Sequence, residues 1–451
     1  MSAVGLLGVS PELQRNLWLE LTPIRLIAAP LVLFVLLGGV GSVFGAEAAA
    51  RVAVLLLWTL LSLWGSRLAA ESFGEEATGR TWDVQRLSAQ SAWGLTLGKL
   101  IGGTAYVWYG ALISAAILLM LGAETVGDML GAATLAGLTA QSTAFFTVLL
   151  LHRFDDRAPR AHTTFAQIVG IVAGWNSHVL ALPAQIRTMA GVHTIDWYGF
   201  EFPADSFFTM LQIAAILWLV FGAMRIIRRE LGFQDGPFGW TLYTLYTLVM
   251  VGGFVSDALG SQIATGGLAT LPVIAFGVQS LLGVAAFALT YLAAFGTPVS
   301  RIALVKLRAA AIARDWRGVW RNLPAWVPSA VAAMVAAIFL SLRLASSAVP
   351  EPSAATPIAA LGFLARDLGL IVGLRLAYRR RTAVTLLVTF LFLYALLPAL
   401  LARPSGGTLL PLFYPGRGAS PVGLVLPWLE AFAVWFFGWR RSAPRGVAAV
   451  Y

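Results

Sequence analysis

Apolar residues along this chain collect in twelve long segments that are separated by shorter, more polar stretches. Each segment is close to the roughly 20 residues that an α-helix needs to cross the hydrocarbon core of a bilayer. The pattern therefore predicts an all-α polytopic membrane protein with about twelve transmembrane helices. The predicted spans are 24–45, 50–70, 98–122, 129–151, 163–184, 207–227, 238–259, 269–296, 325–345, 355–377, 384–402 and 421–439.

Positive charges occupy alternate gaps between these spans. Most of the 31 Lys and Arg residues lie before the first span, after every second span, or after the last one. Because Lys and Arg are retained on the cytoplasmic side of membrane proteins, we expect both termini to be cytoplasmic. The gaps on the opposite side hold only Arg51, Arg187, Arg343, Arg403 and Arg417.

The composition agrees with a membrane protein and excludes some kinds of partner and catalytic site. The chain is 59% hydrophobic and 12% charged, with a mean hydropathy of +0.80. A net charge of +10 could favour nucleic acid, but the basic residues cluster at span ends, where anionic lipid headgroups are the expected partner. We therefore predict contact with membrane lipid and none with nucleic acid. The absence of cysteine excludes thiolate catalysis, cysteine metal sites and disulfides.

The chain divides into two halves of six spans each, residues 1–232 and 233–451. In each half the main cytoplasmic insertion follows the second span, at 71–98 and at 297–324. That register is typical of two parallel repeats, although the residues themselves align poorly, so a duplication stays open.

Three polar segments are expected to form amphipathic helices, two of them at the inner membrane surface and the one at 71–98 either on the membrane or on a partner. Residues 10–22 form the first, with Ser10 as N-cap, Pro11 at the first helical position and a stripe of leucines at positions 13, 17 and 21. The second is 71–98, which is too apolar for a flexible linker. The third is 297–324, where six basic residues accompany Trp316 and Trp320.

No motif for enzymatic catalysis stands out, and we predict that the chain is not an enzyme. Residues 94–100 only faintly resemble a phosphate loop, because the glycine spacing is one residue short and no Ser or Thr follows Lys99. The four histidines are scattered without the helical spacing of a metal site, so no metal site is predicted.

Five polar residues inside the predicted spans need partners, because an unpaired polar group in lipid is costly. One interpretation is a substrate path or proton relay, and the other, which we favour, is structural pairing between helices. For the second we expect Arg366 to pair with Glu430 or with Asp367. The five residues are Asn176, His178, Arg366, Asp367 and Glu430.

The segment 71–99 carries an acidic pair, Glu75-Glu76, and then the step Gly79-Arg80-Thr81. Leu87 and an amphipathic stretch to Trp93 follow, before Gly98-Lys99-Leu100 opens the third span. This order resembles the loop between the second and third spans in membrane subunits of type-2 ABC exporters. Here Arg80 replaces the usual Thr and Ala89 replaces a common Pro. The resemblance covers about residues 10–230, including the helix at 10–22, which is similar to the connecting helix of the family.

The resemblance implies that this chain is the permease subunit of an ATP-driven exporter in the bacterial cytoplasmic membrane. In that family the loop holds a coupling helix that docks on a separate cytoplasmic ABC ATPase subunit, which binds the ATP, so this chain would need no cofactor. The pore would be either a homodimer or a single chain with two halves. The implied docking residues are Glu75, Glu76, Arg80, Asp83, Arg86 and Trp93.

Two other functions compete with this interpretation. Twelve spans with both termini inside also suit an ion-coupled secondary transporter, although such proteins place their long loop between spans six and seven. A membrane-embedded glycosyltransferase would need an acidic or metal-binding pair at the membrane edge, for which Asp196, Glu201 and Asp205 are weak candidates. Nothing in the sequence identifies a substrate.

Overall fold

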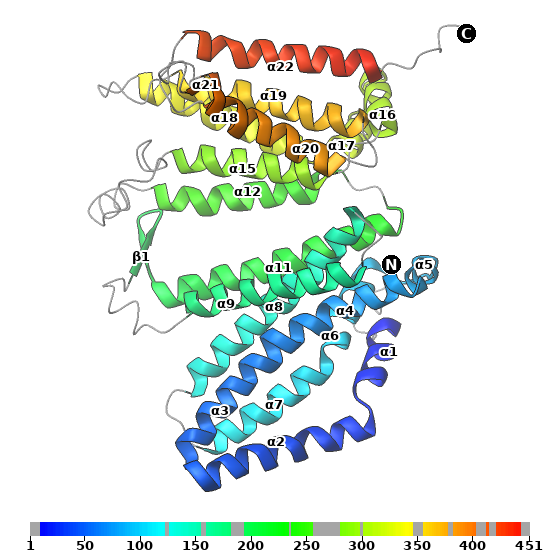
Figure 1. Ribbon diagram of the computed structural model, residues 1–451, viewed down its shortest axis with the longest axis vertical. Helices are drawn as coiled ribbons and strands as arrows, with labels where there is room; N and C mark the ends of the chain where they lie inside the picture. The colour runs from blue at the N-terminus through cyan, green and yellow to red at the C-terminus, as the bar shows by residue number, and fades with distance from the viewer. Residues whose placement is uncertain are drawn as a thin grey trace. The chain divides into compact units, whose positions relative to one another are not determined.

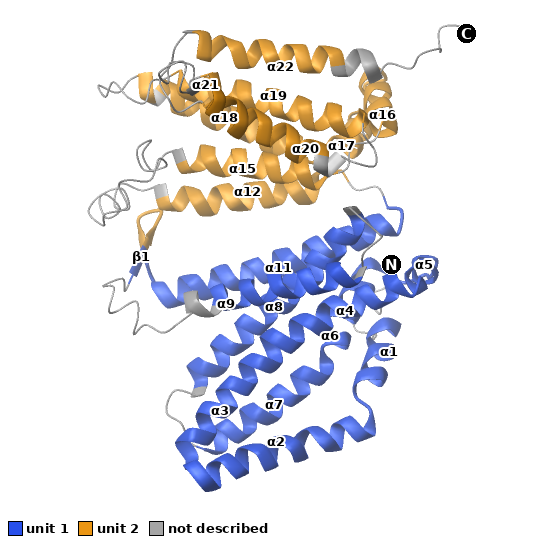
Figure 2. Cartoon of the chain, in the orientation of Figure 1, with its two compact units in different colours: residues 1–195, 201–234 blue, residues 196–200, 235–451 orange. Residues whose placement is uncertain are grey.

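The computed structural model forms two compact units, residues 1–195 with 201–234 and residues 196–200 with 235–451 (Figure 2). The structure describes residues 10–121, 126–154, 159–181, 194–233, 236–255, 280–297, 301–345, 355–377, 382–402, 412–414 and 421–442.

Unit 1 is a bundle of helices (Figure 1). A short helix α1 precedes the long α2, and the short α5 lies between α4 and α6. The helices are α1 (Pro11–Glu20), α2 (Pro23–Phe44), α3 (Ala46–Trp58), α4 (Gly65–Thr78), α5 (Thr81–Arg86), α6 (Ala92–Gly103), α7 (Ala105–Met120), α8 (Val126–Phe154), α9 (Pro159–Ala181) and α11 (Ala204–Glu230).

The sequence explains where α2 begins and ends. Pro23 stands at its first position after the N-cap Thr22, whose hydroxyl accepts a hydrogen bond from the backbone of Arg25. Gly45 follows the helix with a φ of 86°, a left-handed conformation that glycine adopts without steric cost. Large apolar side chains such as Ile27 and Phe34 are 70% exposed along α2. Such a surface is suited to lipid rather than to water.

A π-helical turn, η2 (Thr59–Trp64), joins α3 to α4 into one long helical segment. The wider turn leaves the carbonyl of Leu61 available, and the buried side chain of Gln141 donates a hydrogen bond to it across 2.9 Å. The same amide accepts a hydrogen bond from Trp108 at 3.0 Å. The irregular turn is therefore satisfied by polar side chains of neighbouring helices, as a break in a membrane helix requires.

Small residues let α8 and α9 approach each other closely. A Cβ at Gly170 would lie 2.6 Å from the carbonyl oxygen of Ala140, and one at Gly174 would lie 2.9 Å from that of Ala136. Helix pairs in membranes are held by this kind of close backbone contact.

A hairpin of two short strands, β1 (Thr194–Trp197) and β2 (Phe200–Pro203), leads into α11. Its tip belongs to unit 2, where Tyr198 donates hydrogen bonds to the carbonyls of Val249 and Gly253. The remaining elements of unit 2 are α12 (Phe238–Gly252), η3 (Gly253–Val255), α15 (Ser280–Gly296), α16 (Arg301–Ile312), α17 (Trp316–Asn322), α18 (Trp326–Ala345), α19 (Thr356–Ala377), α20 (Thr382–Leu391), η4 (Phe392–Leu396), α21 (Leu397–Ala402) and α22 (Pro421–Ser442).

Helix α19 forms the centre of unit 2, and most of its residues are buried. It packs closely along α22, where a Cβ at Gly369 would lie 2.9 Å from a methyl group of Val434. The core of this unit is completed by apolar residues of α15, α18 and α20.

The described residues of each predicted span are mostly helical, although α6 and α7 meet at a 48° bend inside the span predicted at 98–122. Within those residues, five helices are long and apolar enough to cross a membrane, or eight if each of three bent pairs is one span. The prediction of an all-α polytopic membrane protein is thus confirmed at this level. Twelve spans, two six-span halves and cytoplasmic termini stay predictions.

Candidate functional site

The candidate site begins where α1 packs on α6 in unit 1. Ser10 caps α1 by accepting a hydrogen bond from the backbone of Leu13, and its hydroxyl donates to the carbonyl of Gly94 at 3.1 Å. Two glycines of α6 make the approach close. A Cβ at Gly98 would lie 2.8 Å from Glu12, and one at Gly102 would lie 2.6 Å from Asn16.

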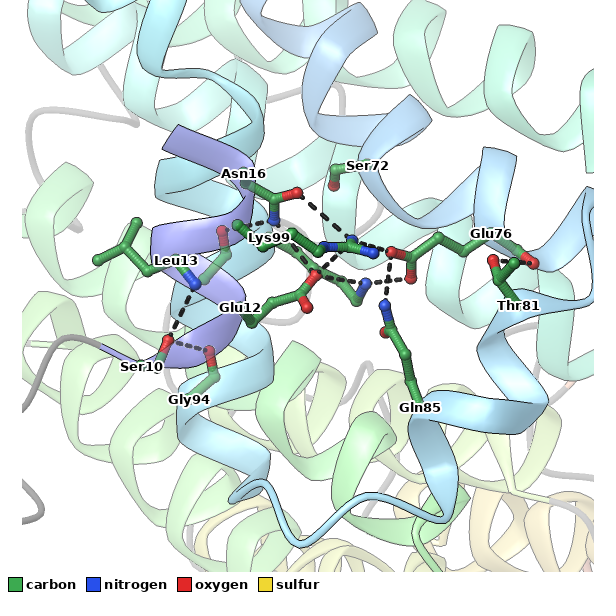
Figure 3. A network of polar contacts seen from close by, with 12 residues as sticks. Ser10, Glu12, Leu13, Asn16, Ser72, Glu76, Thr81, Gln85, Gly94 and Lys99 are labelled. Atoms are coloured by element: carbon green, nitrogen blue, oxygen red, sulfur yellow. Dashed lines mark hydrogen bonds and ion pairs between the residues drawn. The ribbon is translucent and has the colours of Figure 1, made fainter. Parts of the chain in front are cut away.

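Lys99 lies at the centre of a charge cluster that we define as Glu12, Arg15, Glu76 and Lys99 (Figure 3). Its side chain is fully buried, and its Nζ lies 3.0 Å from Oε1 of Glu12 and donates a second hydrogen bond to Glu76. Glu12 is 2% exposed and Glu76 is 9% exposed. Buried charges of this kind persist only when each has a close partner of opposite sign.

Arg15 supplies the second positive charge of the cluster. Its guanidinium donates to Glu12 at 2.9 Å and also to Glu76. Burial works to lower the pKa of Arg15, but the hydrogen bond to Glu76 and the charges of both carboxylates outweigh it and raise the pKa above its ordinary value. Two carboxylates therefore face two cations, and the charge cluster is formally neutral.

Helix α5 is attached to this cluster through side chains on its inner face. Gln85 donates a hydrogen bond to Glu76 at 2.7 Å, and the hydroxyl of Thr81 donates to the backbone carbonyl of Glu76 at 3.3 Å. Trp82 is 3% exposed, with its ring 5.7 Å from the ammonium of Lys99 and 5.1 Å from the ring of Phe73. The short helix is thereby fixed to α4 and α6 rather than held by its own hydrogen bonds, which six residues could not sustain.

The outer face of α5 and the turns beside it form an exposed surface that mixes charges with apolar side chains. Val84 is 71% exposed and Leu87 is 89% exposed. We call this set the α5 surface: Glu75, Arg80, Asp83, Val84, Arg86, Leu87 and Trp93, all exposed. Arg86 also anchors the surface, because its side chain donates to the backbone carbonyl of Glu230 at 3.0 Å and pairs with Asp83 at 3.4 Å.

One implied docking residue does not lie on this surface. The resemblance groups Glu76 with Glu75, but the carboxylate of Glu76 points inward to Lys99 and Arg15 and is buried. The physical reason is helical geometry: neighbouring residues of α4 project in directions about 100° apart, so only Glu75 reaches the surface. Glu76 is a structural member of the charge cluster.

A second polar network lies in unit 2, and it contains both ion pairs that the sequence suggested. Arg366 donates to Asp367 at 3.0 Å and to Glu430 at 2.9 Å. Its third contact is the hydroxyl of Tyr394 at 2.8 Å, and Tyr291 donates to Asp367 at 2.8 Å. Arg366 and Asp367 are buried, whereas the side chain of Glu430 is 38% exposed.

The structure does not bring the other two intramembrane candidates into this network. Asn176 is exposed on α9, and its amide donates to the carbonyl of Val172 one turn earlier. The side chain of His178 lies outside the described residues. Across the part of the chain that is described, no three His, Asp or Glu side chains gather in a way that could hold a metal ion.

Sequence reasoning missed the charge cluster itself. The sequence predicts an apolar stripe of leucines at positions 13, 17 and 21 for a helix at the membrane surface, and it gives no partner for Glu12. Instead Glu12 and Asn16 are the buried residues of α1, while Trp18 is 73% exposed. Two signals could have indicated this: a lysine inside a predicted span, and the Gly98–Gly102 pair that marks a close helix contact.

Comparison with known proteins gives no match. No protein family, curated protein or solved structure matches this chain.

Proposed function

We propose that this chain is the membrane permease subunit of an ATP-driven ABC-type exporter. It would carry no catalytic residue and would receive mechanical force from a separate cytoplasmic ATPase subunit. Localisation in a bacterial cytoplasmic membrane is part of the same proposal.

The observation that carries the proposal is the α5 surface, a short exposed helix whose inner face is fixed to buried charges. Exposed apolar side chains at Val84 and Leu87, flanked by charges of both signs, suit a protein partner better than a lipid surface. The resemblance of 71–99 to the coupling loop of type-2 exporters gives that partner its class.

The charge cluster supplies a route for the force. A push on α5 would act on Glu76 through Gln85 and on Lys99 through Trp82. Lys99 is part of α6, and its other partner Glu12 is part of α1, so these helices would move together. Because these contacts are buried and close, α1, α4 and α6 are expected to move as one packed body rather than through separate side-chain adjustments.

The test is capture of the partner from native membranes. The tagged intact chain should retain an ATP-hydrolysing subunit, and the V84D/L87D variant should lose it while remaining folded. The matched control is F200D, which places a charge on an exposed apolar position of the β hairpin, outside the α5 surface. The proposal would be refuted if V84D/L87D still retained the ATPase subunit, or if the unaltered chain captured no ATPase.

A second candidate, an ion-coupled secondary transporter, is favoured by one observation. The network of unit 2 holds one arginine and two carboxylates, so it has one more carboxylate than cations. A proton or cation at the partly exposed Glu430 would balance it. Transport of a solute that is driven by a proton gradient, needs no nucleotide and is lost in E430Q would support this candidate over the first.

A further inference from the structure

Helices α16 and α17 follow α15 in unit 2. Neither helix contains a buried residue. The axis of α17 makes an angle of 94° with that of α18, and the axis of α16 makes 117° with that of α15. If α15 and α18 cross the bilayer, α16 and α17 extend along its surface.

Helix α16 presents an exposed apolar face. Ile302 and Val305 are 68% and 62% exposed, and Ile312 is 74% exposed. These positions share one side of the helix, while Leu304 and Leu307 are half-buried on another side. Lys306 borders the exposed face on one side, and Arg301 and Arg308 border it on the other, as the helical period of 3.6 residues requires.

The second helix extends the same pattern. Trp316 is 74% exposed at the start of α17, and Trp320 is 42% exposed one turn later. Tryptophan favours the headgroup depth of a membrane, where its ring is half in contact with apolar chains. Arginine and lysine stems can cover apolar surface while their charges reach the headgroups.

The charge of this pair sets it apart from the α5 surface. Residues 301–321 contain six basic side chains and one acidic side chain, Asp315, whereas residues 71–98 contain four acidic and two basic ones. A strongly basic amphipathic helix is attracted to anionic lipid, because each Lys or Arg near such a surface adds to the binding. On the α5 surface, by contrast, the exposed Glu75 and Asp83 are balanced by Arg80 and Arg86, so that surface gains no such attraction to anionic lipid.

The pair is also held in place by the rest of unit 2. Arg301 donates to the carbonyl of Leu376 at the end of α19, across 3.3 Å. Asp315 caps α17 by accepting a hydrogen bond from the backbone of Gly318 at 3.0 Å. A Cβ at Gly236 would lie 2.7 Å from the carbonyl oxygen of Trp320, so the chain before α12 packs directly against α17. The apolar face is therefore presented by a fixed element.

We propose that α16 and α17 bind the headgroups of anionic phospholipids at the membrane surface. The two cytoplasmic insertions then have different partners: 71–98 meets a protein, and 301–322 meets lipid. The inference does not depend on the proposed export function, since it uses only the exposure, orientation and charge of unit 2.

The test uses a single-cysteine label, which the cysteine-free chain allows without background. V305C is labelled with a polarity-sensitive fluorophore, and the intact protein is placed in lipid nanodiscs of phosphatidylcholine with or without phosphatidylglycerol. A phosphatidylcholine carrying a headgroup spin label serves as quencher. The matched control is V84C on the α5 surface, which is similarly exposed.

We expect phosphatidylglycerol to shift the V305C emission to shorter wavelength and to increase its quenching, with both effects weakened by salt. In the K306Q/R317Q/R321Q variant, the amount of phosphatidylglycerol that gives half of the emission shift should rise by about fivefold for each removed charge at low salt. V84C should respond to neither lipid. This readout involves no transport and no ATPase, so it can fail independently of the proposed function.

Three outcomes would overturn the proposal. The first is a V305C label that stays open to aqueous iodide in both kinds of nanodisc. The second is an equal response of V305C and V84C to phosphatidylglycerol. The third is shielding of V305C by a co-purified protein chain without any response to anionic lipid, which would assign the surface to a protein partner.

Discussion

Lys99 and Glu12 are separated by 87 positions in the sequence, yet the Nζ of Lys99 lies 3.0 Å from Oε1 of Glu12 and both side chains are buried. The pair joins α1 to α6, and Glu76 adds α4 to the same contact. Because Gln85 of α5 bonds to Glu76, the α5 surface is connected to three helices through one charge cluster.

Removal of the central cation should destabilise unit 1 strongly. In K99M the carboxylates of Glu12 and Glu76 would stay buried with only Arg15 as counter-ion. Loss of one partner of a buried ion pair costs about 3–5 kcal/mol in the free energy of unfolding. The control is R51M, which breaks the exposed Arg51–Glu47 pair, whose side chains are 78% and 81% exposed, and should change stability little. Unfolding in mixed detergent micelles measures the stability of K99M and R51M. Equal losses of free energy of unfolding in the two variants would contradict the role of Lys99.

Trp82 should matter for the order of α5 more than any residue of its outer face. W82A removes the ring that packs against Phe73 and Lys99, and a buried Trp→Ala change costs about 3–5 kcal/mol. We expect faster proteolysis of the chain around residues 86–91. W93A, which removes a ring that is 44% exposed in the same loop, provides the comparison. If both variants are cleaved at the same rate, α5 is not held by Trp82.

The docking of α1 should depend on the absence of a side chain at position 102. G102A would place a methyl group 2.6 Å from the Cβ of Asn16, so α1 must move away from α6. Trypsin cleavage at Arg15 should accelerate, because this bond is accessible only when the helix detaches. The control is G39A, where a Cβ would meet nothing within 4 Å. Unchanged cleavage in G102A would show that the contact tolerates the extra carbon.

In unit 2 the two carboxylates of the Arg366 network should behave differently. D367N removes the charge of a fully buried partner and should cost about 3–5 kcal/mol in the free energy of unfolding. E430Q alters a side chain that is 38% exposed and leaves the contacts of Arg366 with Asp367 and Tyr394, so its cost should be smaller. Thermal unfolding distinguishes the two. Full stability and full transport in E430Q would remove both the structural and the proton-relay interpretation of Glu430.

Local sequence signals predicted the elements well. Ser10 and Pro11 marked the start of α1 because capping is decided within one helical turn. The intramembrane charges of Arg366, Asp367 and Glu430 predicted their own pairing, because lipid offers them no other partner.

The orientation of those elements was harder to predict. The leucine stripe of α1 predicts an apolar face at the membrane surface, and these leucines are half-buried. The fully buried residues are Glu12 and Asn16, whose partners on α6 lie more than 80 positions away. The resemblance places Glu76 among the docking residues, but its carboxylate binds Lys99 and Arg15, which lie 23 and 61 positions away in the sequence. Burial of a charge is decided by tertiary contacts, and the local sequence holds only indirect signs of them, here a lysine inside a predicted span and the Gly98–Gly102 pair.

A photo-crosslinker at Leu87 tests directly whether the α5 surface meets an ATPase subunit. L87C carries the crosslinker in native membranes, and L119C, 61% exposed on α7, serves as the control that should face lipid. We predict a protein adduct on L87C alone, identified by mass spectrometry as an ATP-binding subunit. Lipid adducts at both positions, or a protein adduct at Leu87 that binds no ATP, would contradict the account.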